Sequence, residues 1–155
     1  MQMNESDLLL LNSTIESMRQ VFMQSMDASQ PIPIEQGLIQ SGISVLIGIM
    51  GDLQGRLVFH GDLETFSCLG ESMFGMPLEG EMLHSFIGEM ANMIAGKTST
   101  ILSDKGKHVD ITPPTIMLGQ LEIYGFVAGI HVSVHLEEIG KIHIALLFHT
   151  KGGST

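Results

Sequence analysis

One stretch of the chain, residues 81–104, constrains the fold most, because it reads as a single long helix with two distinct faces. Apolar side chains recur along it at steps of three and four residues, which builds a stripe suited to a core. This stripe comprises Leu83, Phe86, Ile87, Met90, Ile94 and Ile101. Small or polar residues recur at the same steps on the opposite side, namely Ser85, Glu89, Asn92, Gly96, Ser99 and Ser103. The sequence therefore predicts a helix that buries one face and exposes the other.

The predicted exposed face carries two sizeable polar side chains, Glu89 and Asn92, one helical turn apart. An E-x-x-N tetrapeptide is common by chance, and such a pair on a helix is usually just solvated. Asn and Gly are poor helix formers, however, and placing them mid-helix gives up helix propensity without an evident gain in packing. Local conflicts of this kind often mark function. The neighbours Ser85, Gly96 and Ser99 are small, so we expect a partner's backbone to bind closely there.

The chemistry of this pair favours completing the active site of another protein. An amide both donates and accepts hydrogen bonds, so Asn92 is suited to holding a water molecule. The carboxylate of Glu89 is suited to pairing with a lysine of a partner. The sequence shows no P-loop, Rossmann fingerprint or G-x-S-x-G motif, and Cys68 stands outside any catalytic signature. An activated nucleophile of this chain's own is therefore not indicated.

Length and charge narrow the class of protein. The 155 residues predict one domain, 1–155, with a flexible tail at 151–155. The net charge of −10, with seven Lys and Arg in all, argues against binding to nucleic acid or to an anionic membrane. A lone cysteine excludes an internal disulfide, the acidic N-terminus lacks the basic region of a signal peptide, and no apolar run is long enough to span a bilayer. We therefore expect a cytoplasmic protein, whose twelve methionines mostly fill the core rather than a promiscuous binding surface.

The first half of the chain is expected to alternate helices and strands. A helix should run from Asn4, its N-cap, to about Asp27, with Leu8, Leu11, Ile15, Met18, Phe22 and Met26 as its buried stripe. Two prolines then break it. The apolar run at 43–50 predicts a buried strand, and the run at 55–60 predicts the returning strand. Asp62 should cap a second helix at 63–74, which ends at 75–77.

The second half is expected to return to strands after the long helix ends near Lys105-Gly106. The segment 108–119 holds two adjacent prolines, which force an extended chain and predict an edge segment or a crossover leading into a short strand. Alternating residues at 126–136 and 141–149 predict a final hairpin. We expect this apolar hairpin and the strand near 111–119 to leave a sheet edge that a second copy covers.

Four histidines of the predicted hairpin fall on its polar sides, namely His131, His135, His143 and His149. They raise the alternative of a zinc site, but no CxxC or HExxH motif and no acidic ligand at helical spacing accompanies them. We therefore expect no metal site and interpret the histidines as part of a half-exposed sheet face.

The block from Ile87 to Gly119, with its E-x-x-N, its N-x-x-x-G step and the segment GKHVDITPPT, resembles the signature of the CheC–CheX–FliY phosphatases of bacterial chemotaxis. It is most similar to CheX, because it has one E-x-x-N helix where CheC carries two. The order of elements on both sides of the block also fits CheX, so the resemblance spans most of the chain. It implies an α/β (α+β) fold, in which a β-sheet packs against long helices that include an N-terminal helix and the central motif-bearing helix.

The resemblance also implies a function. The substrate would be the aspartyl phosphate of a phosphorylated CheY-like response regulator, with Asn92 orienting the attacking water and Glu89 pairing with the regulator's lysine. The Mg²⁺ would belong to the regulator's site, with no cofactor in this chain, and the protein would be a homodimer joined through sheet edges. The alternative is a non-catalytic module that binds a response regulator or a flagellar-switch protein with the same helix.

Overall fold

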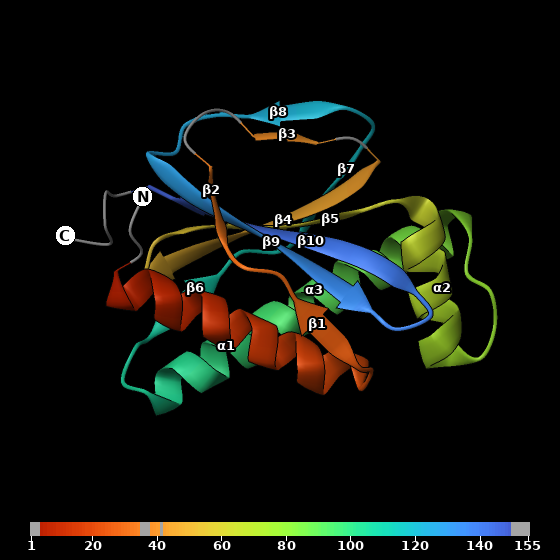
Figure 1. The fold of residues 1–155 in the computed structure, drawn as a ribbon, viewed down its shortest axis with the longest axis horizontal. Helices are drawn as coiled ribbons and strands as arrows, with labels where there is room; N and C mark the ends of the chain where they lie inside the picture. Colours follow the sequence, from red (N-terminus) through yellow and green to blue (C-terminus); the bar gives the residue numbers. More distant parts are fainter. Residues whose placement is uncertain (1–3, 35–37, 41, 150–155) are drawn as a thin grey trace.

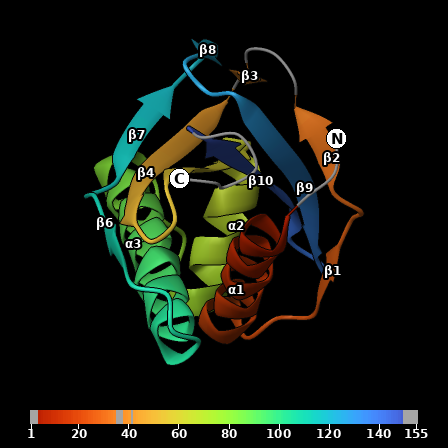
Figure 2. The same ribbon diagram turned by 90° about the vertical axis from the view of Figure 1, so that its left-hand side faces the viewer.

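A curved antiparallel sheet covers a layer of helices in this computed structural model, which describes residues 4–34, 38–40 and 42–149 (Figure 1). Three helices occur within those residues, namely α1 (Glu5–Phe22), α2 (Leu63–Phe74) and α3 (Gly80–Asp104). The long helix predicted from the sequence is α3, and Figure 2 shows the sheet arching over α3 and α1. The predicted arrangement of a sheet packed against an N-terminal helix and a central helix is confirmed.

The strands of the described residues form one large sheet and one small one. They are β1 (Met26–Ala28), β2 (Ile32–Ile34), β3 (Leu38–Gln40), β4 (Ile43–Gly51), β5 (Gly55–Gly61), β6 (Val109–Ile111), β7 (Thr115–Leu118), β8 (Leu121–Ile123), β9 (Ala128–Leu136) and β10 (Gly140–Phe148). The large sheet has the order β1–β9–β10–β5–β4–β6, with β2 also on β9 and β7 also on β4. β3 pairs with β8 over the face that the helices leave free (Figure 1).

The final hairpin forms as its alternation predicts, but it lies inside the sheet. The side chains expected to face inward are all buried, namely Ile130, Val132, Val134, Leu136, Ile142, Ile144, Leu146 and Phe148. β9 is covered by β1 and β2, while β10 pairs with β5, so the expectation that this hairpin leaves a sheet edge is wrong. The strands that pair with the outer edge of β9 follow α1, in a segment where the prolines favour an extended chain. Pro33 fits an outer strand because it has no N–H to donate.

The proline segment forms the opposite edge, as predicted. β6 and β7 both pair with β4, so they act as one edge strand that is interrupted at Thr112, Pro113 and Pro114. Thr112 bridges this gap, because its N–H donates to the carbonyl of Gly48 over 3.0 Å. The two prolines therefore form the rigid joint between the two short strands.

The first helix begins as predicted but ends earlier. Asn4 is its N-cap and accepts a hydrogen bond from the N–H of Asp7 over 2.7 Å. The helix ends at Phe22, because Met23 adopts a left-handed conformation with φ 55°. Met26 is buried as expected, but it lies in β1 opposite Leu136. Its position four residues after Phe22 matches helical spacing, although the helix has already ended. Leu11, Met18 and Phe22 of the predicted stripe are buried, but Leu8 is 42% exposed, and Leu10 and Thr14 are buried in addition.

The core lies between the sheet and the helices and fixes the orientation of α3. Leu83, Ile87, Met90 and Ile94 are buried, whereas Ile101 is half-buried and its neighbour Leu102 takes the core position. Small hydroxyl side chains allow α1 to approach closely, and Thr98 donates to the hydroxyl of Ser17 over 2.9 Å. No helix of the described residues is long and apolar enough to cross a membrane. The predicted tail at 151–155 lies outside the described residues.

Candidate functional site

The exposed face of α3 presents Glu89 and Asn92, as the sequence predicts. Both side chains are exposed, and Ser85 lies exposed one turn before Glu89. They are held outward because Ile87, Met90 and Ile94, on the other side of the same turns, are fully covered by the core. The position of the pair is therefore set by the packing of the helix rather than by a mobile loop.

A hollow of about 530 Å³ separates this face from the proline segment. One wall comes from α3 and consists of Ser85, Gly88, Glu89 and Asn92. The other wall is the chain from Ile111 to Pro114. We call this space the proline hollow. Asn92 thus lies in a concave, partly sheltered place, which is where a side chain can position a small molecule such as water.

Two close contacts fix the far wall of the proline hollow. The side-chain oxygen of Thr112 accepts a hydrogen bond from the N–H of Gly48 over 2.7 Å, which adds to the backbone bond already described. Gly88 allows the wall to approach α3, because a Cβ at that position would lie 3.3 Å from Cδ1 of Ile116. The spacing of the hollow is therefore built into the fold.

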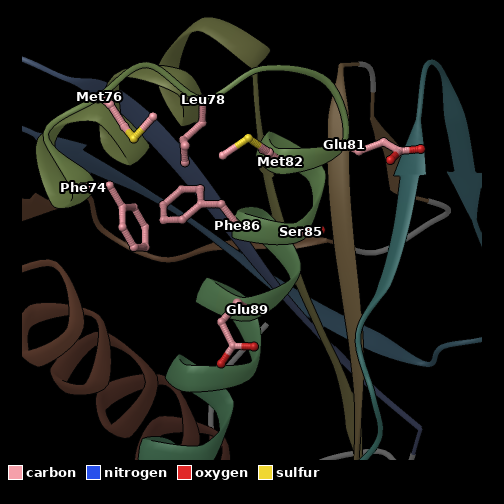
Figure 3. Close-up of a pocket in the computed structure, with 8 residues that line it drawn as sticks. All are labelled: Phe74, Met76, Leu78, Glu81, Met82, Ser85, Phe86 and Glu89. Atoms are coloured by element: carbon pink, nitrogen blue, oxygen red, sulfur yellow. The ribbon is translucent and has the colours of Figure 1, made fainter.

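A second hollow, of about 630 Å³, lies on the other flank of α3 beside the end of α2 (Figure 3). Its apolar lining consists of Phe74, Met76, Leu78, Met82 and Phe86. Glu81, Ser85 and Glu89 complete it, so Ser85 and Glu89 border both hollows. We call this second space the apolar groove. It was not predicted from the sequence, although Met76 within the break at 75–77 and Met82 shortly after it were a signal for it.

The other predicted partner-binding residues lie further along α3. Gly96 is half-buried, and a Cβ built on it would meet nothing within 4 Å. Ser99 is half-buried and its hydroxyl donates to the carbonyl of Val109 over 3.2 Å. The structure thus brings Ser85, Glu89 and Asn92 together around the proline hollow, whereas Gly96 and Ser99 lie outside its lining.

The hairpin histidines do not join this site. His131 and His143 lie on the sheet face that points away from the helices, with their rings stacked and the centroids 5.2 Å apart. The ring of His60 is tilted against that of His143, with the centroids 5.6 Å apart. Burial lowers the pKa of both His131 and His143. Within the described residues no group of three or more His, Cys, Asp or Glu is arranged to hold a metal ion.

Two comparisons with known proteins identify the family of this chain. The family model described as chemotaxis phosphatase CheX matches residues 43–127, which include α3 and the proline segment. A curated protein from Thermotoga maritima, described as CheY-P phosphatase CheX, is 32% identical over 143 residues, which cover 88% of this chain and 92% of the relative. The chain belongs to the CheX family.

Solved structures show the same fold for this CheX-family chain. A CheC-like superfamily protein from Shewanella sp. PV-4 superposes with a TM-score of 0.77 at 21% identity, and the match covers 92% of this chain and 99% of the other. The CheX–CheY–BeF3–Mg²⁺ complex from Borrelia burgdorferi gives a TM-score of 0.74 at 21% identity, with 92% and 97% covered. The fold implied by the resemblance is therefore confirmed at the level of three-dimensional structure.

Proposed function

We propose that this CheX-family chain is a hydrolase that removes the phosphoryl group from the aspartyl phosphate of a CheY-type response regulator in chemotaxis or a related two-component pathway. The observation that carries the proposal is the exposed pair Glu89 and Asn92 on α3, bordering the proline hollow. Two similarities support it: the Thermotoga maritima relative is described as a CheY-P phosphatase, and the Borrelia burgdorferi structure is a complex of CheX with CheY.

We assign Asn92 the role of orienting the attacking water. Its amide can accept a hydrogen bond from the water and donate one to a phosphoryl oxygen. The water oxygen forms a bond to phosphorus in line with the leaving carboxylate, the bond between phosphorus and the aspartyl oxygen breaks, and the water's proton passes to the released phosphate. Little covalent chemistry is left to this chain, since positioning supplies most of the acceleration in such phosphoryl transfers.

Glu89 pairs, in this proposal, with a lysine of the regulator's active site and fixes α3 in register. Its carboxylate lies one turn from Asn92 and borders both hollows, so it stands in the middle of the surface that a partner would cover. The small residues Ser85, Gly96 and Ser99 are assigned to the same docking face, with Ser99 already engaged with Val109. Pairing a buried charge in an interface chiefly determines register and the rate of dissociation.

The Mg²⁺ belongs to the regulator in this proposal. The described residues of this chain offer no acidic cluster that fits the ion, and hard cations such as Mg²⁺ need several oxygen ligands. The Borrelia burgdorferi complex contains Mg²⁺ together with CheY. This chain's own residues therefore bind the regulator and position the water.

The alternative is a non-catalytic module that binds a response regulator or a flagellar-switch protein through α3. Replacing Asn92 by Ala separates the two functions, because it removes the amide and leaves Glu89 in place. We expect phosphate release to slow on the order of 10²-fold or more while binding of a phosphorylated receiver changes little. Glu89→Ala should weaken binding by about 2 kcal/mol or more, because the partner's lysine is left unpaired.

The control is Asn12→Ala, which makes the same chemical change at an exposed position of α1. It should leave binding and release unchanged. Phosphate release by Asn92→Ala at the parent's rate would make the binding module the better conclusion. Parallel measurements of receiver binding and phosphate release for the three variants test the proposal.

We further propose that residues 1–155 form a single domain, that it assembles as a homodimer through a sheet edge, and that it works in the cytoplasm. One buried cluster joins α1, α2, α3 and the large sheet, which supports the single domain. The edge formed by β6 and β7 supports pairing with a second copy. Cys68 is the chain's lone cysteine and is half-buried, which suits a reducing compartment.

A further inference from the structure

The apolar groove exposes more hydrophobic surface than the junction of α2 and α3 requires. Phe74 is 62% exposed, Met76 52% and Met82 58%. Beneath them, Leu78 and Phe86 are buried. Scattered exposed hydrophobic residues are ordinary in soluble proteins, but large ones gathered around a hollow mark interaction sites.

The groove is preformed by tight packing. The ring of Phe74 meets that of Phe86 edge to face, with centroids 5.7 Å apart. A Cβ on Gly70 would come within 2.8 Å of Cδ1 of Leu78, so the loop after α2 lies directly against that helix. Gly75 makes the turn with φ 76°. A surface held in this way binds without first paying a large ordering cost.

The groove is continuous with the proposed catalytic face. At about 100° per residue, Glu89 points roughly 60° around α3 from Asn92. Met82 points about 80° from Asn92 in the same direction. Glu89 and Ser85 border both the groove and the proline hollow. A protein that sits over Asn92 and Glu89 therefore also covers the groove.

The acidic residues that line the groove limit the kind of ligand group that can bind there. Its titratable lining residues are Glu81 and Glu89, and both are acidic. In Figure 3 the Glu89 carboxylate lies at one end of the groove, whereas Glu81 points away from the clustered apolar side chains. This arrangement fits an apolar side chain that is carried next to a basic group.

We propose that the apolar groove docks the phosphorylated receiver itself, by taking up an apolar side chain that the receiver presents beside the lysine paired with Glu89. The inference rests on the proposed function and adds to it a surface that sets affinity and selectivity without taking part in the chemistry. Methionine is flexible and polarisable, so Met76 and Met82 adapt the groove to receivers with different apolar side chains.

The test uses the double variant Met76→Gln, Met82→Gln, with Met50→Gln as the matched control. Met50 is 54% exposed on β4 and lines neither hollow. The probes are CheY-type receivers loaded with beryllofluoride and Mg²⁺ for calorimetry, and the same receivers phosphorylated for release assays. We expect Kd and KM to rise by about 10-fold in the double variant, as for truncated interface anchors, with kcat unchanged. The control should behave as the parent.

Parental Kd and KM in the double variant would overturn the inference. So would a change confined to self-association in light scattering, since the groove would then hold a second copy. Should the double variant melt early, Met82→Gln alone carries the test, with a smaller rise in Kd expected. A parent that binds the loaded receiver but releases no phosphate contradicts the proposed catalysis alone, and weaker binding by the double variant would still support the groove. A parent that binds no receiver overturns both.

Discussion

Thr112 and Gly48 hold each other through a reciprocal pair of hydrogen bonds. The N–H of Gly48 donates to Oγ1 of Thr112 over 2.7 Å, and the N–H of Thr112 donates to the carbonyl of Gly48 over 3.0 Å. Pro113 and Pro114 follow directly and have no N–H of their own, and pairing with β4 resumes only at Thr115. These two hydrogen bonds therefore determine the distance between Asn92 and the far wall of the proline hollow.

Replacing Thr112 by Val should destabilise the protein and slow phosphate release. Val keeps the shape of the side chain but removes the acceptor, which leaves the N–H of Gly48 without its present partner. We expect the free energy of unfolding to fall by about 1–2 kcal/mol, as for a part-buried hydrogen bond that is lost. Urea denaturation and a phosphate-release assay measure the two effects.

Thr115→Val is the matched control, because Thr115 is exposed at the start of β7. It should change neither the midpoint in urea nor the release rate appreciably. If Thr112→Val unfolds at the parent's urea concentration, the reciprocal bonds do not anchor the wall.

A second prediction concerns Gly96, where a methyl group has room in the free protein. A Cβ there meets nothing within 4 Å, so Gly96→Ala should stabilise the chain by up to about 1 kcal/mol through helix propensity. If a partner's backbone approaches this position, the same methyl group should weaken receiver binding. In Gly96→Ala the melting temperature should therefore rise while the affinity for the receiver falls.

Gly88→Ala provides the contrast. Its Cβ would press on Cδ1 of Ile116 at 3.3 Å, so it should gain less stability than Gly96→Ala or lose some. A Gly96→Ala variant that binds receiver as tightly as the parent would place the docking face elsewhere on α3.

Much of the fold was predictable because the deciding signals are local. Asn4 and Asp62 accept the capping bonds that their positions suggest, from the N–H groups of Asp7 and Thr65. The alternation in the final hairpin and the stripe along α3 each identify a buried face. Periodicity within one element suffices for such predictions.

The rest depends on contacts between distant segments. β1 and β2 are three residues each, too short to show a period, and they exist because β9 offers them backbone partners. β3 and β8 likewise pair across more than half the chain and were not predicted. The site shows the same division: Glu89 and Asn92 were recognisable on one helix, whereas the apolar groove needs the end of α2 to lie beside α3.

The predicted homodimer is tested at the β6–β7 edge. Leu118 is 58% exposed on β7, and charged residues on edge strands block pairing with another chain. Light scattering over a dilution series should therefore show a dimer for the parent and a shift to monomer for Leu118→Lys. Leu8→Lys, on the exposed side of α1, is the control and should remain dimeric. A parent that is monomeric throughout the micromolar range would contradict the prediction.

Two histidines on the helix-free face of the sheet, His131 and His143, should make stability depend on pH. His60 and His143 are opposite each other on β5 and β10, and His131 stacks on His143 from β9. Desolvation by burial is the main reason that the pKa values of His131 and His143 lie below the ordinary 6.5, and the charges of the neighbouring histidines lower them further. Lys141 acts in the same direction on His143, whereas Asp62 opposes it.

Because the folded pKa values are lowered, the unfolded chain takes up protons first as the pH falls. Stability should therefore be fully present above about pH 6.5 and decline below it, until the folded histidines are protonated as well. Thermal melts at intervals between pH 7.5 and pH 5.5 should show a falling midpoint for the parent. The free energy of unfolding should fall by an amount on the order of RT, and the protein should stay folded. His143→Gln should flatten this dependence, because it removes one of the two rings whose pKa is lowered in the folded protein. His149→Gln is the control, since His149 is exposed and lies beyond the end of β10. A slope in His143→Gln equal to that of the parent would show that the stacked histidines do not titrate with folding.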